Sequence, residues 1–301
     1  MLKEVKAFVL NKLQISEANV RHIGGGFYAD VYKFDFQNKE TQIIKVYKSK
    51  GIMIKEVSQI QLLSQYALFP MPTAIWTYTA NDSFAYDVLA MNYLEGENGG
   101  KAFYLSPSKR AKLAEQVIDN LIAFHNVHNA DGFGQIDSDT YYKTFNEYYK
   151  EKALDILNMA KKLHNDGQLT DYVLNVVSKA VENFDKIFYL PITEASLIHG
   201  DYNMWNVLID KKNCKVTAII DPCGCMWADS EYDLYQLNNA NGKHLKLFET
   251  YANKKTLSEN CSQKMAFYEL FTEIEHYHNS GYPVIQKLIK KQADNLKEYL
   301  T

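Results

Sequence analysis

The stretch SLIHGDYNMWNVLID, residues 196–210, decides how this chain is interpreted. An apolar run meets His199, Gly200 and Asp201, and Asn206 follows the aspartate by five residues, just before another short apolar segment. Gly, Asp and Asn all favour turns, so a surface turn is one interpretation. The other is a catalytic loop in which the aspartate is a base and the asparagine binds a metal ion. The sequence around this stretch has to distinguish the two.

The residues that follow predict a β-hairpin, because NVLID and VTAII are joined by the polar segment KKNCK. If the turn lies in the middle of that segment, Leu208 pairs near Ile219. Asn206 then lies opposite Asp221 at the open end, one short loop from Asp201. Carboxylate and amide oxygens suit Mg²⁺, which takes few protein ligands besides phosphate oxygens. A further carboxylate nearby can accept a proton from a hydroxyl. The pattern predicts phosphoryl transfer rather than acyl transfer.

Composition sets outer limits on the function. The chain has 301 residues, of which 47% are hydrophobic and 23% charged, which is enough for two lobes. Its 33 basic and 36 acidic residues give a net charge of −3, so we expect no nucleic-acid partner. No apolar run approaches the roughly 18 residues of a membrane span, and the first fifteen residues are interrupted by charges. We therefore expect no membrane partner, and the oligomeric state stays open.

The four cysteines, Cys214, Cys223, Cys225 and Cys261, are too few and too crowded for a disulfide framework. They predict a reduced, cytoplasmic protein. No second Cys or His pair lies at zinc-like spacing from Cys223-Gly-Cys225. Because this pair follows Asp221 closely, oxidation at the Cys214, Cys223 and Cys225 cluster is a hypothesis for inhibition.

The first part of the chain, residues 1–94, predicts a small lobe of strands and two helices. An amphipathic first helix precedes a triple glycine between two β-prone segments, and a second helix and further strands follow. The segment TQIIKVYK favours a strand with Ile43, Lys45 and Tyr47 on one face.

The character of the sequence changes after residue 94. Residues 95–100 are polar and glycine-rich and are the expected linker. Residues 101–301 are mostly helix-compatible, apart from the predicted hairpin, and form the expected second lobe. The whole chain is therefore of the α+β class.

The motif His-Gly-Asp-x-x-x-x-Asn, followed by IIDP at 219–222, resembles the catalytic and metal loops of the aminoglycoside phosphotransferase-like superfamily. These small-molecule kinases are related to protein kinases. The resemblance implies a bilobal protein-kinase-like fold, with a small antiparallel-sheet N-lobe carrying one or two helices and a mainly helical C-lobe carrying the catalytic hairpin. It also implies ATP and Mg²⁺ as cofactors, Asp201 as catalytic base, and Asn206 and Asp221 as metal ligands.

The same resemblance implies that residues 1–94 are the nucleotide-binding lobe and residues 101–301 the catalytic and substrate-binding lobe, and it assigns nucleotide contacts in the N-lobe. GGGFYADVY is similar to a phosphate-binding glycine loop, although Ala29 stands where protein kinases have a third glycine, so Gly25 and Gly26 are the expected phosphate-facing residues. Lys45 matches the strand lysine that contacts the α- and β-phosphates, and Glu56 is its expected carboxylate partner. The alternative for Glu56 is a charge that complements a helix N-terminus.

Two further groups follow from the resemblance. The segment LAMNYLEG matches the connection between the lobes, so Met91, Tyr93 and Leu94 are expected to bind adenine, chiefly through main-chain groups. His199 is expected to order the catalytic loop through hydrogen bonds. Asp233 is expected to accept hydrogen bonds from the loop's backbone N–H groups.

Within the superfamily, DPCGCMWADSEYDL and FYELFTEIEHYHNSGY resemble the fructosamine kinase branch. That branch usually has Leu-Trp-Ser-Gly between the aspartate and the asparagine, and here these positions read Tyr-Asn-Met-Trp. The branch implies a ketosamine acceptor such as a fructosamine or ribulosamine. An aminoglycoside or choline-type acceptor, or an inactive nucleotide-binding module, are the alternatives. The substrate candidates are Tyr202, Trp205, Glu231 and His276, with Glu231 equally interpretable as a helix-start charge.

Overall fold

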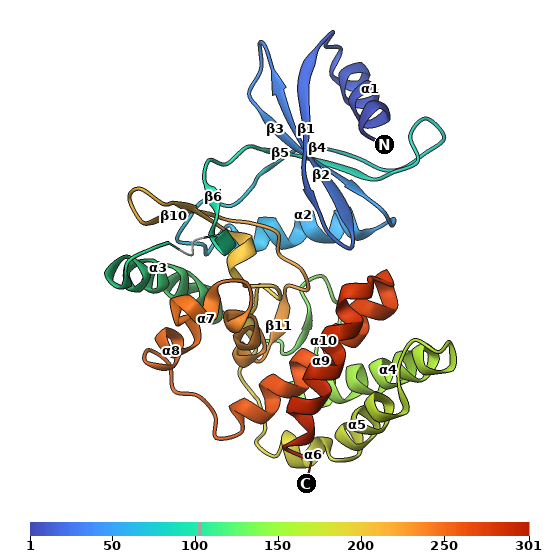
Figure 1. The fold of residues 1–301 in the computed structure, drawn as a ribbon, viewed down its shortest axis with the longest axis vertical. Coiled ribbons are helices and arrows are strands. Elements are labelled where there is room, and N and C mark those ends of the chain that lie inside the picture. Colours follow the sequence, from blue (N-terminus) through green and yellow to red (C-terminus); the bar gives the residue numbers. More distant parts are fainter. Residues whose placement is uncertain (102–103, 301) are drawn as a thin grey trace.

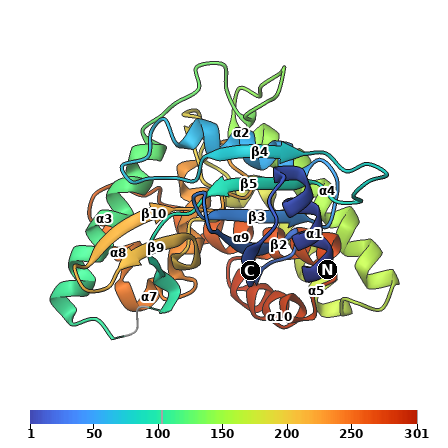
Figure 2. The ribbon, with the colours of Figure 1, turned by 90° about the horizontal axis from the view of Figure 1, so that it is seen from above.

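The computed structural model describes residues 1–101 and 104–300, which form two lobes stacked along the long axis of the molecule (Figure 1). The upper lobe is a five-stranded antiparallel sheet with strand order β1-β2-β3-β5-β4, flanked by two helices. Figure 2 shows these strands side by side from above. The elements of this lobe are α1 (Leu2–Leu13), β1 (Ala18–Gly25), β2 (Ala29–Phe36), β3 (Gln42–Tyr47), α2 (Ile52–Leu63), β4 (Ala74–Tyr78) and β5 (Val88–Asn92).

The two faces of this sheet are covered by different helices. Val5 and Val9, one helical turn apart on α1, are buried against one face together with Ile44. The opposite face carries Tyr47 and packs against Met53 of α2 and its neighbours. This alternation along β3 follows from the two-residue period of a strand. It agrees with the prediction that Lys45 and Tyr47 share one face, the face turned toward α2.

The lower lobe is mainly helical and contains two small three-stranded sheets, β10-β9-β6 and β7-β11-β8. Its elements are β6 (Glu97–Asn98), η1 (Gly99–Lys101), α3 (Pro107–His125), β7 (Gly134–Gln135), α4 (Phe145–Asn165), α5 (Asp171–Glu182), α6 (Phe184–Ile187), β8 (Ser196–Leu197), η2 (Met204–Asn206), β9 (Val207–Asp210), β10 (Lys215–Ile219), β11 (Met226–Ala228), η3 (Ser230–Asn238), α7 (Gly242–Leu245), α8 (Leu247–Ala252), α9 (Cys261–Ser280) and α10 (Pro283–Lys297). None of the helices in the described part of the chain is long and apolar enough to cross a membrane.

Local sequence explains where the long helices begin. Thr144 caps α4 through a reciprocal pair of hydrogen bonds with Glu147, the capping box that commonly starts a helix. Pro107 opens α3 after Ser106, a position where a missing N–H has no cost. The hairpin of β9 and β10 shares one apolar core with α3, and α4 belongs to the other large core of this lobe.

The structure confirms the predicted two-lobed α+β fold and adds short strands that the sequence did not reveal. Glu97 and Asn98, expected within a linker, form β6 and pair with β9 of the catalytic hairpin. A two-residue strand carries too little periodicity to be recognised, because its partner lies more than a hundred positions away.

Candidate active site

The backbone of the loop that begins with His199 is held by hydrogen bonds to a buried carboxylate. Asp233 has no exposed surface, and its two oxygens accept the backbone N–H groups of His199 at 2.9 Å and Gly200 at 2.8 Å. Gly200 has a φ of +82°, and a Cβ there would lie 2.2 Å from the carbonyl oxygen of Cys223. Only glycine fits this position, which explains the Gly in the His-Gly-Asp motif.

The imidazole of His199 is completely buried between aromatic rings. It stacks on Phe124 and meets Tyr202 edge to face. Burial lowers the pKa of His199, so the ring is neutral, and its Nδ1 accepts the backbone N–H of Asp201 at 3.4 Å. This geometry suits a residue that orders the loop.

Asp201 is held by two asparagine side chains. Its Oδ1 accepts the amide of Asn203 at 2.6 Å, and its Oδ2 accepts the amide of Asn206 at 2.8 Å. Burial, with a further contribution from the charge of Asp221, raises the pKa of Asp201 to about 8. A carboxyl of this basicity is suited to take a proton from an alcohol. Sequence reasoning did not assign Asn203 a role, since its position differs from the nearest branch.

The predicted hairpin is present, and Leu208 pairs with Ala218, next to Ile219 as expected. Val207 pairs with Ile219, which places Asn206 level with Ile220, one residue before Asp221. The backbone N–H of Ile220 donates to the carbonyl of Asn206 at 2.9 Å. Asp221, the next residue, has a φ of +57°, a conformation that is costly for a non-glycine residue and concentrates at functional sites.

Lys45 joins the two lobes. Its Nζ lies 2.7 Å from Glu56 Oε1 and 2.7 Å from Asp221 Oδ1. Burial of Lys45 opposes its charge, but the carboxylates of Asp221 and Glu56 outweigh that effect and raise the pKa of the lysine. The hydroxyl of Tyr47 donates to the other oxygen of Glu56 at 2.7 Å. Glu56 lies in the second turn of α2, which begins at Ile52, so it partners the lysine rather than a helix N-terminus.

The donor set beside Asp201 fits a Mg²⁺ ion. Within the described residues, Asn206 uses only its amide nitrogen, and Asp221 uses only Oδ1, in hydrogen bonds. Asn206 Oδ1 and Asp221 Oδ2 are therefore available as oxygen ligands, which Mg²⁺ prefers in combination with phosphate oxygens. The part of the chain that the structure describes contains no group of three His, Cys, Asp or Glu residues that could hold a metal ion by itself.

The residues that are expected to bind the nucleotide belong to the N-lobe. Gly25 ends β1, where a Cβ would lie 2.7 Å from the Asp30 carboxylate, while a Cβ on Gly26 would meet nothing within 4 Å. Met91 is buried in β5, and Tyr93 is partly exposed with the ammonium of Lys33 3.8 Å from its ring centre.

The connection between the lobes keeps its main chain available. The main-chain groups of Tyr93 and half-buried Leu94 form no hydrogen bond within residues 1–101 and 104–300. They remain free for a planar base.

Two of the four substrate candidates are structural residues. The side chain of Tyr202 is 1% exposed, and its hydroxyl donates to the carbonyl of Val117 at 2.8 Å. Glu231 is also buried, with one oxygen accepting from the backbone N–H of Ser258 and the other 2.9 Å from Lys264 Nζ. Both side chains are held by partners inside the C-lobe, so neither is free to contact an acceptor.

The other two substrate candidates, Trp205 and His276, each contact residues of another element. Trp205 is half-exposed and packs on Gly100, where a Cβ would lie 2.6 Å from its ring. It also receives, at its carbonyl, the side-chain amide of Asn98 at 2.6 Å. His276, near the end of α9, stacks on Phe27 from the glycine-rich turn. The aromatic contact of His276 had no sequence signal, because the two residues are far apart in the chain.

The cysteines near the site are free thiols. Cys223 is half-buried, and burial, with added repulsion from Asp201 and Asp221, raises the pKa of its thiol. Because the thiolate is the reactive form, a raised pKa makes this thiol less reactive. The geometry thus gives no support to the oxidation hypothesis.

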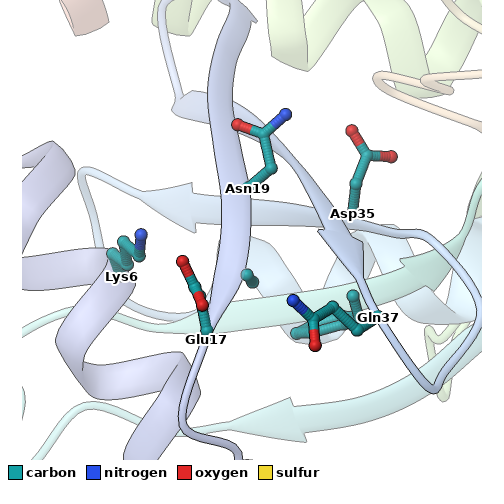
Figure 3. A pocket seen from close by; sticks show the side chains of 7 residues that line it. Lys6, Glu17, Asn19, Asp35 and Gln37 are labelled. Atoms are coloured by element: carbon teal, nitrogen blue, oxygen red, sulfur yellow. The ribbon is translucent and has the colours of Figure 1, made fainter.

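A pocket on the N-lobe is separate from these residues. Figure 3 shows it between α1 and the strands β1 and β2, lined by the polar side chains of Lys6, Glu17, Asn19, Asp35 and Gln37. It shares no residue with the cluster around Asp201, so it has no part in the site described above.

The fold and the residues around Asp201 define a kinase-like phosphotransferase. The profile of the phosphotransferase enzyme family, APH, matches residues 19–249, and the chain belongs to this family. Among curated relatives, the uncharacterized protein YcbJ of Escherichia coli K12 is 22% identical over 220 residues, which is 73% of each chain.

Solved structures show the same fold along nearly the whole chain. A presumed fructosamine-3-kinase from Haemophilus somnus 129PT superposes with a TM-score of 0.71 and 13% identity, covering 98% of this chain and 97% of that one. The GDP and kanamycin complex of APH(2″)-IIIa has a TM-score of 0.68 and 15% identity, with 98% and 97% covered. The match of the family profile to residues 19–249 confirms the predicted superfamily.

Proposed function

We propose that this phosphotransferase moves the γ-phosphoryl group of ATP to a hydroxyl of a small molecule. One observation carries the proposal: Lys45, from the N-lobe, reaches Asp221 of the C-lobe at 2.7 Å, next to the loop that holds Asp201. A lysine, a candidate metal ligand and a candidate base therefore converge from three separate parts of the chain. The neighbour solved with GDP and kanamycin supports binding of a nucleotide and a small molecule by this fold.

In the proposed reaction Asp201 orients the acceptor hydroxyl and accepts its proton. The acceptor oxygen forms a bond to the γ-phosphorus while the bond to the bridging oxygen of ADP breaks. Lys45, kept charged by Glu56 and Asp221, pairs with the phosphates. The amides at Gly25 and Gly26 would bind phosphate oxygens. When bound to Asn206 and Asp221, Mg²⁺ would neutralise phosphate charge.

We further propose a ketosamine as the acceptor, meaning a sugar joined to an amine. The resemblance of DPCGCMWADSEYDL to the fructosamine kinase branch and the full-length superposition on a presumed fructosamine-3-kinase support this choice. Kanamycin binding by the other neighbour makes an aminoglycoside the second candidate.

The acceptor is tested by ATP depletion with a panel of fructosamine, ribulosamine, kanamycin and choline. Turnover with fructosamine or ribulosamine is expected. Turnover with kanamycin or choline alone would replace the ketosamine assignment and leave the kinase assignment intact. No phosphorylation of any acceptor, with ATP bound normally, would favour an inactive nucleotide-binding module.

The role of Asp201 is tested by Asp201→Ala. We expect turnover to fall by about 10²–10⁴-fold, the usual contribution of a positioned general base, while Mg·ATP binds with nearly unchanged affinity in calorimetry. Asp155→Ala is the matched control, since Asp155 is an exposed aspartate on α4. Turnover that survived Asp201→Ala would refute the assigned base.

A further inference from the structure

The tip of the glycine-rich turn contacts the opposite lobe. Phe27 follows Gly26 in the turn between β1 and β2, and its ring stacks on His276 with a centroid distance of 5.9 Å and an interplanar angle of 29°. The same ring meets Tyr282 edge to face at 5.2 Å and 80°. Tyr28 also meets His276, edge to face at 6.4 Å. In Figure 1 this hairpin points toward α9 and α10.

Phe27 is packed against the large apolar core of the second lobe. That core is built from α4, α5, α9 and α10, and among the described residues of 1–94 only Phe27 joins it. Tyr282 stands at the start of α10, immediately after the left-handed Gly281 that ends α9. The surface on which Phe27 docks is therefore formed by the last turns of α9 and the start of α10.

Hydrogen bonds join the tip of the glycine-rich turn to its glycines, so the two parts move together. The N–H of Gly26 donates to the carbonyl of Ala29 at 2.9 Å, which closes the turn around Phe27. Lys48 Nζ donates to the carbonyl of Gly26 at 2.9 Å, and its backbone N–H donates to Tyr28. Where Phe27 docks consequently fixes where Gly25 and Gly26 lie.

The rings of His276 and Tyr28 that surround Phe27 are both uncharged. Burial lowers the pKa of His276, against an opposing effect of Glu275, so the ring is neutral at physiological pH. Burial, with the neighbouring Cys223 and Glu275, raises the pKa of Tyr28 to about 12, so this ring is neutral too. Two neutral rings can therefore face Phe27 without a charge penalty.

We propose that Phe27 is a positioning residue, which docks on His276 and Tyr282 and thereby holds the Gly25–Gly26 turn against the phosphates during transfer. This inference rests on the proposed kinase function. Phe27 touches neither phosphate nor acceptor in this role. It acts through the turn, and it links closure of the lobes to the step in which phosphate charge is redistributed.

The test compares Phe27→Ala, His276→Ala and the double variant with the wild type. The two ring contacts of Phe27 together correspond to roughly a tenfold change in an equilibrium constant. We therefore expect kcat to fall about tenfold in each single variant. The KM for ATP should change less than threefold, since adenine and Lys45 still bind. The double variant should be no worse than either single variant, because both remove the same contact.

Two further variants separate positioning from stability. His276→Phe keeps a stacking ring and should restore most of the kcat that His276→Ala loses. Ile23→Ala removes a half-exposed side chain from the same strand, β1, and should leave kcat unchanged. Deuterium exchange without nucleotide should rise at residues 24–28 in Phe27→Ala and not in Ile23→Ala.

The outcomes distinguish this inference from the proposed function. A wild type that binds no Mg·ATP and transfers no phosphoryl group would overturn the proposed function. An active wild type with unchanged kcat in Phe27→Ala, or with additive losses in the double variant, would overturn the positioning role alone. A loss of kcat in His276→Phe equal to that in His276→Ala would do the same.

Discussion

Two buried lysines in this protein have nearly the same surroundings and different consequences. Lys45 lies between Glu56 and Asp221, with a tyrosine hydroxyl, that of Tyr47, on one of the carboxylates. Lys264 lies between Asp229 and Glu231 at 2.7 and 2.9 Å, with the hydroxyl of Tyr268 donating to Asp229 at 2.7 Å. Each network is one ammonium, two carboxylates and one phenol.

The difference is the exposure of one carboxylate. The side chain of Asp221 is 50% exposed and belongs to the other lobe, whereas both partners of Lys264 are under 10% exposed and belong to the same lobe. A closed network can only hold the fold together, because no ligand reaches it. An open network can exchange its protein partner for a ligand, since the exposed carboxylate can turn to a metal ion. Whether such a network can bind a ligand thus depends on whether one of its carboxylates faces solvent.

The largest effect is expected from opening the closed network. Lys264→Met would leave Asp229 and Glu231 buried without a cation, and breaking a buried pair from one side costs about 3–5 kcal/mol. Chemical denaturation should show this loss in the free energy of unfolding. In the fraction that remains folded, Mg·ATP affinity should match the wild type, because Lys264 does not face the nucleotide.

A stability loss below about 1 kcal/mol would break the comparison by showing that Lys264 is dispensable. Lys254→Met is the matched control, because this lysine pairs with Glu115 and Asp119 on the surface. Surface pairs contribute roughly 0–1 kcal/mol, so this control should lose little.

Lys45→Met should have the opposite profile. Losing a charge that faces the phosphates should reduce kcat about 10²–10³-fold, a typical cost of removing one electrostatic stabiliser. Glu56 keeps the Tyr47 hydrogen bond and Asp221 faces solvent, so the free energy of unfolding should fall less than in Lys264→Met. Steady-state kinetics and denaturation on the same two variants make the measurement. Equal stability losses with unchanged kcat would contradict the distinction.

Sequence alone gave much of the fold and the outline of the site. The His-Gly-Asp loop, the hairpin and the strand of Lys45 are local patterns, and local patterns can be read from one sequence. Strand alternation put Lys45 and Tyr47 on one face, although it could not show that Tyr47 bonds Glu56. The irregular pairing between Val216 and Ala218 left no mark in the sequence, because a bulge depends on packing across the hairpin.

The acceptor side was the least predictable part. Tyr202 and Glu231 were expected near the substrate because they flank the motifs, and burial of both showed otherwise. The direction in which a side chain points from a loop depends on what the rest of the chain packs against it. The contact between Phe27 and His276 is of the same kind, since it joins a turn and a helix end about 250 positions apart only through the closed arrangement of the lobes.

The smallest predicted effect concerns Glu273, a half-buried carboxylate on α9 that forms no ion pair within the described part of the chain. Burial, reinforced by Glu269, raises the pKa of Glu273 to about 7. The folded state then favours the protonated form, so this contribution to stability is complete below the unfolded pKa and is lost as pH rises through about 7. Glu273→Gln, which cannot ionise, should therefore be roughly 1–2 kcal/mol more stable than the wild type at pH 8 and similar at pH 5. Glu231→Gln, whose charge pairs with Lys264, should lose stability at pH 8. The comparison is made by thermal unfolding at the two pH values. If the stability of Glu273→Gln changed with pH in parallel with the wild type, the Glu273 carboxylate would be as well accommodated in the fold as that of Glu231.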